Sequence, residues 1–164
     1  MALQSVLVTD TNIWIDLENG GILADVFRLP YRFLTPDFAI PEFIHPRWET
    51  LEVLGLETHE LMAEQVVELV QLRQIHRNLS ITDLAAFLLA KMLEATLLTG
   101  DGRLNELANA NGISVHGVLW LLDEMVHFQA LTPGQTAIAL RRMLDQGARI
   151  PSEECSHRFA SWSE

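Results

Sequence analysis

The sequence predicts one α/β domain in which helices flank both faces of a parallel central sheet, an α/β/α sandwich. Short β-branched, apolar runs alternate with longer segments of helical periodicity, which is the pattern of strands joined by crossover helices. The chain has 164 residues, of which 49% are hydrophobic, enough for one sizeable core. It contains no repeat and no linker-like stretch. We therefore place a single domain at residues 1–150 and a C-terminal tail at residues 151–164.

The first elements are a strand and a helix that meet at Asp10. Residues 5–9 form a short apolar run typical of a buried parallel strand, and polar residues that cap helices follow it. We expect a helix over residues 11–17. A second strand at residues 33–37 then leads into an irregular, proline-containing helix that includes Glu42.

The middle of the chain predicts two consecutive helices. Apolar residues recur at helical spacing from 58 to 77. Ser80 and Asp83 precede an apolar run over residues 84–90 and have the spacing of a capping box, so Ser80 is the expected N-cap. The remaining elements are a strand at 95–99, a helix near 104–110, a strand at 113–115, a helix at 116–128 and a last helix from about 133 to 146.

Composition limits the class of protein. The amino terminus lacks the pattern of a secretory signal and no apolar run is long enough to span a bilayer, so we expect a soluble, cytoplasmic protein without membrane contact. Cys155 is the only cysteine, which excludes an internal disulfide and a cysteine-based metal site. The net charge of −11 opposes binding to nucleic acid unless cations neutralise some of the acids, and it suits a basic partner.

Four carboxylates lie where predicted elements begin or end. Asp10 and Asp101 directly follow buried strands, whereas Glu42 and Asp83 lie near the starts of helices. Parallel sheets bind ligands outside the carboxyl ends of their strands, so these acids could converge and hold Mg²⁺ or Mn²⁺. Each acid also has a structural interpretation. Asp10 and Asp101 could be N-caps, Asp83 could belong only to the capping box, and Glu42 could be a solvated surface acid.

Four segments together resemble the PIN-domain family, in particular the VapC-like toxin ribonucleases. A hydrophobic strand runs into Asp-Thr-Asn at residues 6–12, and Thr-Gly-Asp stands in a similar setting later in the chain. The resemblance extends to about residue 128. Its segments are residues 6–12, 79–86, 97–104 and 111–115.

The resemblance implies a PIN-like fold and a Mg²⁺- or Mn²⁺-dependent endoribonuclease, the toxin of a type II toxin–antitoxin pair. The implied partners are an RNA substrate, an antitoxin protein and a second copy of the chain in a homodimer. The ion would activate a water in line with the scissile phosphate. The implied catalytic and metal-ligating residues are Asp10, Glu42, Asp83 and Asp101, and the supporting residues are Asn12, Ser80 and Thr99.

The sequence departs from the family pattern at two places. Pro41 and its surroundings are unusual beside Glu42, which leaves Asp37 as a fallback ligand. Arg103 stands where many members carry a further acid, which puts a second metal site in doubt. Arg103 could contact RNA phosphate, as could Arg73 and Arg77, or all three could be solvated. Asn12 could only stabilise its turn, and Ser80 and Thr99 could act as ordinary caps.

Two other functions compete with the nuclease. A haloacid-dehalogenase-like phosphatase would use Asp10 and Asp101, but it needs an acid where Asn12 stands and a lysine in a loop, whereas Lys91 lies in a predicted helix. A PIN-like protein without catalysis, acting as a binding module or scaffold, is the second alternative.

Overall fold

The fold is built on a parallel sheet, as the sequence predicts, and this sheet has five strands, one more than the four predicted. The computed structural model describes residues 5–163. The strand order is β3-β2-β1-β4-β5, and every neighbouring pair is parallel. The strands are β1 Ser5–Thr9, β2 Tyr31–Pro36, β3 Glu57–His59, β4 Thr96–Leu98 and β5 Val115–His116.

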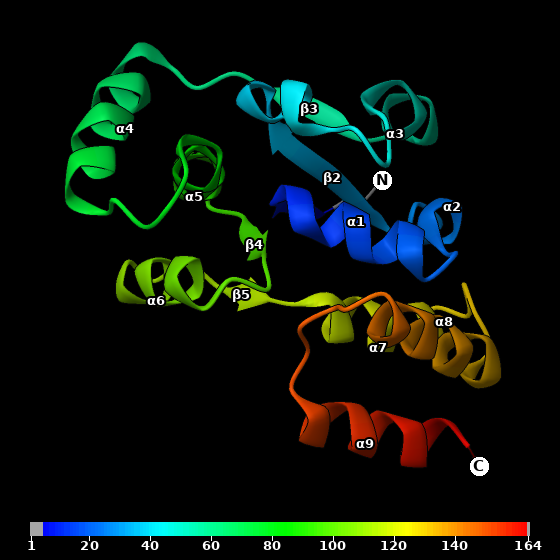
Figure 1. The fold of residues 1–164 in the computed structure, drawn as a ribbon. Coiled ribbons are helices and arrows are strands. Elements are labelled where there is room, and N and C mark those ends of the chain that lie inside the picture. The colour runs from blue at the N-terminus through cyan, green and yellow to red at the C-terminus, as the bar shows by residue number, and fades with distance from the viewer. Residues whose placement is uncertain (1–4, 164) are drawn as a thin grey trace.

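Helices cover both faces of this sheet, which confirms the predicted α/β/α layers (Figure 1). One layer consists of α4 Ala63–Ile75, α5 Ile81–Leu93 and α6 Gly102–Ala110, and the other of α1 Thr11–Asn19, α2 Leu23–Val26, α7 Val118–His127, α8 Pro133–Asp145 and, outside them, α9 Ser152–Trp162.

Adjacent residues on the strands serve the two opposite cores. Leu7 and Leu98 pack with the α1 layer, whereas Val8 and Leu97 pack with the α5 layer. Successive side chains of a strand point to opposite faces, so a strand covered on both sides is apolar at every position. Burial on both faces therefore explains why the strand segments of the sequence are continuously apolar.

The strand order places the carboxyl ends of β1 and β4 side by side. The chain leaves β1 toward β2 on one side, and β4 pairs with β1 on the other, so the topology reverses between β1 and β4. The backbone N–H of Asp10 donates to the carbonyl oxygen of Leu98 at 3.1 Å, which continues the pairing past the end of β1. In open α/β sheets this reversal is where ligands bind.

Helix starts follow the predicted caps. The Ser80 side chain accepts a hydrogen bond from the backbone of Asp83, the Asp83 carboxylate accepts one from the backbone of Ser80, and α5 begins at the next residue. Thr132 and Gln135 form a second capping box at the start of α8, where Pro133 takes the first position.

The helix predicted over 58–77 is wrong at its beginning. Residues Glu57–His59 form the edge strand β3, paired with β2, and α4 begins only at Ala63. All three β3 residues are exposed, so the strand carries no apolar signature. An ion pair between Glu57 and Arg32 of β2, 2.9 Å apart, joins the two strands instead.

The last strand also lies later than predicted, at Val115–His116 instead of 113–115. Ile113 donates its N–H to the carbonyl oxygen of Ala108 and closes the end of α6. His116 therefore belongs to the sheet, paired with Leu98, and the next helix begins at Val118 instead of at residue 116.

The region around Glu42 forms a short 3-10 helix, η1 Asp37–Glu42, with Glu42 as its last residue. Pro41 lies inside this helix and lacks the N–H that an α-helix would need. Two further helices, α2 and α3 Trp48–Leu54, are absent from the sequence prediction.

The predicted tail forms helix α9, which packs on the body. Its Cys155 and Trp162 are buried in the core on the α1 side of the sheet. The predicted domain includes residues 1–4 and the predicted tail includes residue 164, and these residues lie outside the part of the chain that the structure describes. Within residues 5–163, no helix combines the length and the apolar character needed to cross a membrane.

Gly20 is required where α1 approaches α8. A Cβ at this position would lie 2.7 Å from Met143 Cε and 3.2 Å from the carbonyl oxygen of Ala139. We expect Gly20→Ala to lower the free energy of unfolding by about 1 kcal/mol or more through overpacking. Gly134→Ala is the matched control, because a Cβ there meets no atom within 4 Å and alanine favours the helix. Urea unfolding checks both, and equal stability of Gly20→Ala and the unmodified protein would contradict the packing argument.

Candidate active site

Asp10 occupies the point where β1 ends and α1 begins. Its side chain is only 3% exposed. As the N-cap of α1, it accepts a hydrogen bond from the N–H of Ile13 at 3.2 Å through Oδ1. The hydroxyl of Thr99 donates to its other oxygen, Oδ2. One carboxylate thus connects the end of β1, the start of α1 and the end of β4.

Thr99 links Asp10 to Asp101. Its hydroxyl oxygen accepts a hydrogen bond from the N–H of Asp101 at 3.0 Å while its proton is donated to Asp10. Asp101 caps α6 through Oδ1, which accepts from the N–H groups of Arg103 at 2.8 Å and Leu104 at 3.1 Å. Its Oδ2 makes no hydrogen bond to any described residue and is available to a ligand.

Asp83 approaches the same place from the start of α5. Its Oδ2 accepts the N–H of Ser80 at 3.0 Å, so the capping box fixes the carboxylate at the first turn of the helix. Asp83 and Asp101 therefore each cap a helix and also lie close to Asp10.

Burial and two neighbouring acids set the ionisation of Asp10. Loss of hydration on burial raises its pKa from 3.8 to about 6, although the hydrogen bonds from Thr99 and Ile13 act in the opposite direction. The negative charges of Asp83 and Asp101 contribute to this rise. The three aspartates are thus close enough to repel one another, and a cation among them would relieve the repulsion.

Glu42 lies beside this group without joining it directly. The hydroxyl of Thr11, the first residue of α1, donates to Glu42 Oε2 at 3.4 Å, and the glutamate is exposed. Asp37, the predicted fallback ligand, begins η1 and makes no hydrogen bond or ion pair with the three aspartates in the described structure. Between these two candidates, Glu42 is the better placed.

A buried polar network holds α1 in position behind Asp10. Trp14 Nε1 donates to the hydroxyl of Thr9 at 2.8 Å, and both side chains are fully buried. The Trp14 ring stacks on Phe27 at 5.3 Å and meets Phe33 of β2 edge-on at 5.6 Å. These contacts fix the first turn of α1 and with it the direction of the Asp10 side chain.

An open depression, which we call the Asp101 hollow, lies beside Asp101. It has a volume of about 570 Å³. Arg103 and Arg149 both line it, and neither has an ion-pair partner among the described residues. Its walls are Asn12, Ile15, Asp16, Asn19, Gly100, Asp101, Gly102, Arg103, Gln146, Gly147, Ala148 and Arg149. Two cations therefore border an acidic centre in a chain of net charge −11.

The donor atoms suit a hydrated Mg²⁺ or Mn²⁺ better than a metal in a closed cage. Within residues 5–163, no three His, Cys, Asp or Glu side chains lie close enough together to hold an ion by themselves. Mg²⁺ commonly binds through one or two carboxylates, several waters and substrate phosphate. Asp10, Asp83 and Asp101 offer hard oxygen atoms around a shared negative potential, so the residues present fit this mode.

The rival phosphatase lacks its lysine. Lys91 Nζ pairs with Glu68 Oε1 at 3.2 Å, within the α4 and α5 layer. Asn12 occupies the position where that chemistry needs a second acid. His116 of β5 stacks on Trp120 with ring centroids 4.3 Å apart.

Comparison with known families agrees with this geometry. The family model described as DUF3368, a PIN domain, matches residues 6–164. The chain belongs to the PIN-domain family. The matched residues include the C-terminal segment that contains α9.

One solved structure similar to this PIN domain is that of a PilT N-terminus domain protein from the hyperthermophilic archaeon Sulfolobus solfataricus P2. The two chains are 14% identical, and the match covers 72% of this chain and 91% of the other with a TM-score of 0.48. No curated protein matches the chain. The PIN fold is generally a nuclease fold, and PIN domains typically use divalent metal ions.

The sequence prediction missed two residues that border the site. Asp16 lies on α1 and Arg149 follows α8, and both line the Asp101 hollow. Asp16 lies beside the buried stripe of α1 formed by Ile13, Trp14 and Leu17, which is a weak sign that it is not simply solvated. No local sequence pattern marks Arg149, because it reaches the sheet edge only when the chain returns from α8.

We expect Asp10→Asn to stabilise the protein in the presence of chelator at pH 7 but not at pH 4. Below pH 3.8 Asp10 is protonated in both states, and stability is lost as the pH rises toward 6 because the unfolded chain ionises first. Asparagine removes this penalty, worth about 1–3 kcal/mol at pH 7. Urea unfolding at both pH values measures it.

The exposed Glu18 on the same helix provides the control, since Glu18→Gln should change stability equally at both pH values. A loss of stability in Asp10→Asn at pH 7 would show that the buried charge is stabilising and would contradict the electrostatic argument.

Proposed function

We propose that this PIN domain is a Mg²⁺- or Mn²⁺-dependent endoribonuclease. One observation carries the proposal: a buried aspartate, Asp10, lies at the reversal point of the sheet and has its pKa raised to about 6 with contributions from Asp83 and Asp101. A folded protein gains nothing in stability from such a group, which is the usual signature of a functional site. The membership in a nuclease family supports the choice of reaction.

The proposed metal ligands are Asp10, Asp83 and Asp101, with Glu42 reaching the site from η1 through water. When bound, the ion supplies Lewis-acid activation of a water molecule and neutralises charge on the phosphate that is cleaved. No side chain then has to act as nucleophile.

The chain's own residues orient these ligands. Thr99 holds Oδ2 of Asp10 and the backbone of Asp101 at once, so it fixes the relative position of two carboxylates from neighbouring strands. Ser80 fixes Asp83 through the capping box. Asn12 lines the Asp101 hollow one turn before Asp16, where it can contact substrate or the ion's water shell.

Arg103 stands where other members carry a further acid, and here it lines the hollow as a cation. This placement supports a role in binding RNA phosphate, and it favours one metal ion over two. A phosphate diester entering the hollow would bring negative charge to Arg103 and Arg149 and would complete the ligands of the ion.

Cleavage of a mixed structured RNA pool tests the proposal. The protein should cleave RNA with Mn²⁺ or Mg²⁺ but not with chelator. Asp10→Asn and Asp101→Asn should each lose more than the roughly 10- to 100-fold that changes outside the ligand shell of a metal site already cause. The matched control is Glu106→Gln, which removes an exposed acid from the same helix α6 that Asp101 caps.

Cleavage that persists in chelator, or that Asp101→Asn leaves intact, would contradict the assignment. A folded protein that cleaves no RNA with either ion would instead be a PIN domain that serves as a binding module.

The proposed partners are RNA, an antitoxin and a second copy of the chain, with the RNA-containing cytoplasm as the place of action. Exposed apolar side chains on α4 support a protein interface, since contiguous apolar patches on a surface commonly mark one. Val67 is 60% exposed and Val70 is 58% exposed, and Phe38 and Ile81 lie next to this helix.

We expect light scattering to give about twice the chain mass of 18.5 kDa. Val70→Asp should shift the mass to that of a single chain, because a buried unpaired charge opposes association. Val53→Asp is the control, since Val53 is 86% exposed on α3, away from the α4 patch. A single-chain mass for the unmodified protein would contradict the dimer.

A further inference from the structure

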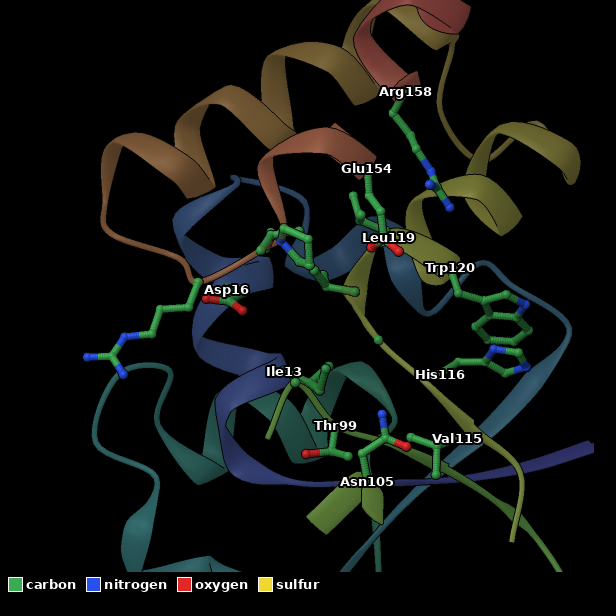
Figure 2. A pocket seen from close by; sticks show the side chains of 16 residues that line it. Ile13, Asp16, Thr99, Asn105, Val115, His116, Leu119, Trp120, Glu154 and Arg158 are labelled. Carbon is green, nitrogen blue, oxygen red and sulfur yellow. The ribbon is translucent and has the colours of Figure 1, made fainter. Parts of the chain in front are cut away.

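A second cavity opens beside the candidate active site, between the sheet edge and the C-terminal helix. This α9 pocket has a volume of about 330 Å³, within the size range of small-molecule sites. Figure 2 shows Ile13, Asp16 and Thr99 on one side, Glu154 and Arg158 reaching in from α9 on the opposite side, and Trp120 and His116 on a third.

The α9 pocket is continuous with the Asp101 hollow. Asp16, Gly100 and Arg149 line both. A Cβ at Gly100 would meet no atom within 4 Å, so the backbone between Thr99 and Asp101 is open at the junction. A strand of RNA whose phosphate lies at Asp101 can therefore place an adjoining nucleotide in the α9 pocket.

Besides the exposed Glu154, the carboxylate that lines this pocket is Asp16. It is half-buried, and no described residue donates a hydrogen bond to its carboxylate or forms an ion pair with it. Loss of hydration raises its pKa. A partly buried carboxylate without a hydrogen-bond donor has lost hydration that nothing replaces. A ligand that brings N–H groups therefore binds to it with a larger gain in free energy than to a fully solvated carboxylate.

Arg149 is the cation available at the junction. Arg158, the other arginine of the pocket, is held by Asp123 at 2.9 Å, whereas Arg149 has no ion-pair partner among the described residues. RNA phosphates are bound mainly by such arginines, which fix the position of the strand without reading its sequence.

The walls of the pocket are partly aromatic and apolar. His116 and Trp120 stack with an interplanar angle of 6°, and Ile13, Val118 and Leu119 add apolar surface. Proteins that recognise single-stranded RNA combine aromatic and apolar walls with polar groups that read the edge of the base.

We propose that the α9 pocket holds the base of the RNA nucleotide next to the scissile phosphate, with Asp16 as the residue that selects an amino-bearing base and Arg149 bound to the adjoining phosphate. The proposal rests on the proposed ribonuclease function and deepens it. Cytosine, adenine and guanine present an NH₂ group, whereas the 4-position of uracil is an oxygen that a carboxylate repels.

Equilibrium binding of two labelled hexanucleotides tests the selection without requiring cleavage. Cytidylate and uridylate hexamers differ mainly at the 4-amino or 4-oxo group. With Ca²⁺ replacing Mg²⁺, and with gels to verify intact RNA, fluorescence anisotropy should give roughly fivefold or tighter binding of the cytidylate. Asp16→Asn should bring this ratio close to one, with weaker binding of cytidylate and unchanged or tighter binding of uridylate, because a negative charge is also removed.

Glu18→Gln is the matched control on α1 and should preserve the ratio. Arg149→Gln should weaken binding of both hexamers equally and reduce the slope of log affinity against log salt by about 1. Arg47→Gln, which changes an exposed arginine at the start of α3, should alter neither value.

Any of three results would overturn the proposal. The unmodified protein could bind both hexamers equally, Asp16→Asn could leave the binding ratio unchanged, or Arg149→Gln could leave the salt slope unchanged. The cleavage assay separates this outcome from failure of the nuclease. Metal-dependent cleavage with no effect of Asp16→Asn on the ratio would reject only the base site, whereas an Asp16-dependent ratio without cleavage would retain the site and reject the nuclease.

Discussion

The structure depends on a carboxylate that the protein buries at a cost. Asp10 receives hydrogen bonds from Ile13 at the start of α1 and from Thr99 at the end of β4, so it fixes the helix and the neighbouring strand relative to β1. These bonds lower its pKa, yet burial outweighs them and raises the value to about 6. Since a neutral cap such as asparagine could make comparable bonds without this cost, helix capping alone does not explain an aspartate at this position.

Capping and metal binding are compatible at this sheet edge because a carboxylate has two oxygens. Asp101 uses Oδ1 for the first N–H groups of α6, and Asp83 uses Oδ2 for the capping box of α5. Each retains a second oxygen for a ligand. The caps also hold the side chains rigid, so an ion would meet ligands whose conformational entropy is already lost.

Sequence reasoning identified the sheet and the aspartates because both depend on local signals. The buried strands are continuous apolar runs, and Asp10, Asp83 and Asp101 stand directly beside such runs. The missed edge strand β3 is exposed at all three residues, so no hydrophobic pattern could reveal it. The α9 pocket was equally hidden, because the chain brings Arg149 beside Gly100 only after α8 has returned to the sheet edge.

The arrangement of cations addresses the strongest objection to an RNA substrate, which is the net charge of −11. Some cations elsewhere form ion pairs, such as Arg32 with Glu57 and Lys91 with Glu68. Arg103 and Arg149, in contrast, border the Asp101 hollow without an ion-pair partner among the described residues. Beyond a Debye length of about 8 Å in physiological salt, surface charge is largely screened, so a phosphate in the hollow interacts chiefly with the groups that line it. These are Arg103 and Arg149, which attract it, and Asp16 and Asp101, whose negative charge a bound ion would offset. The distant acids then limit the rate of encounter more than the affinity at the site.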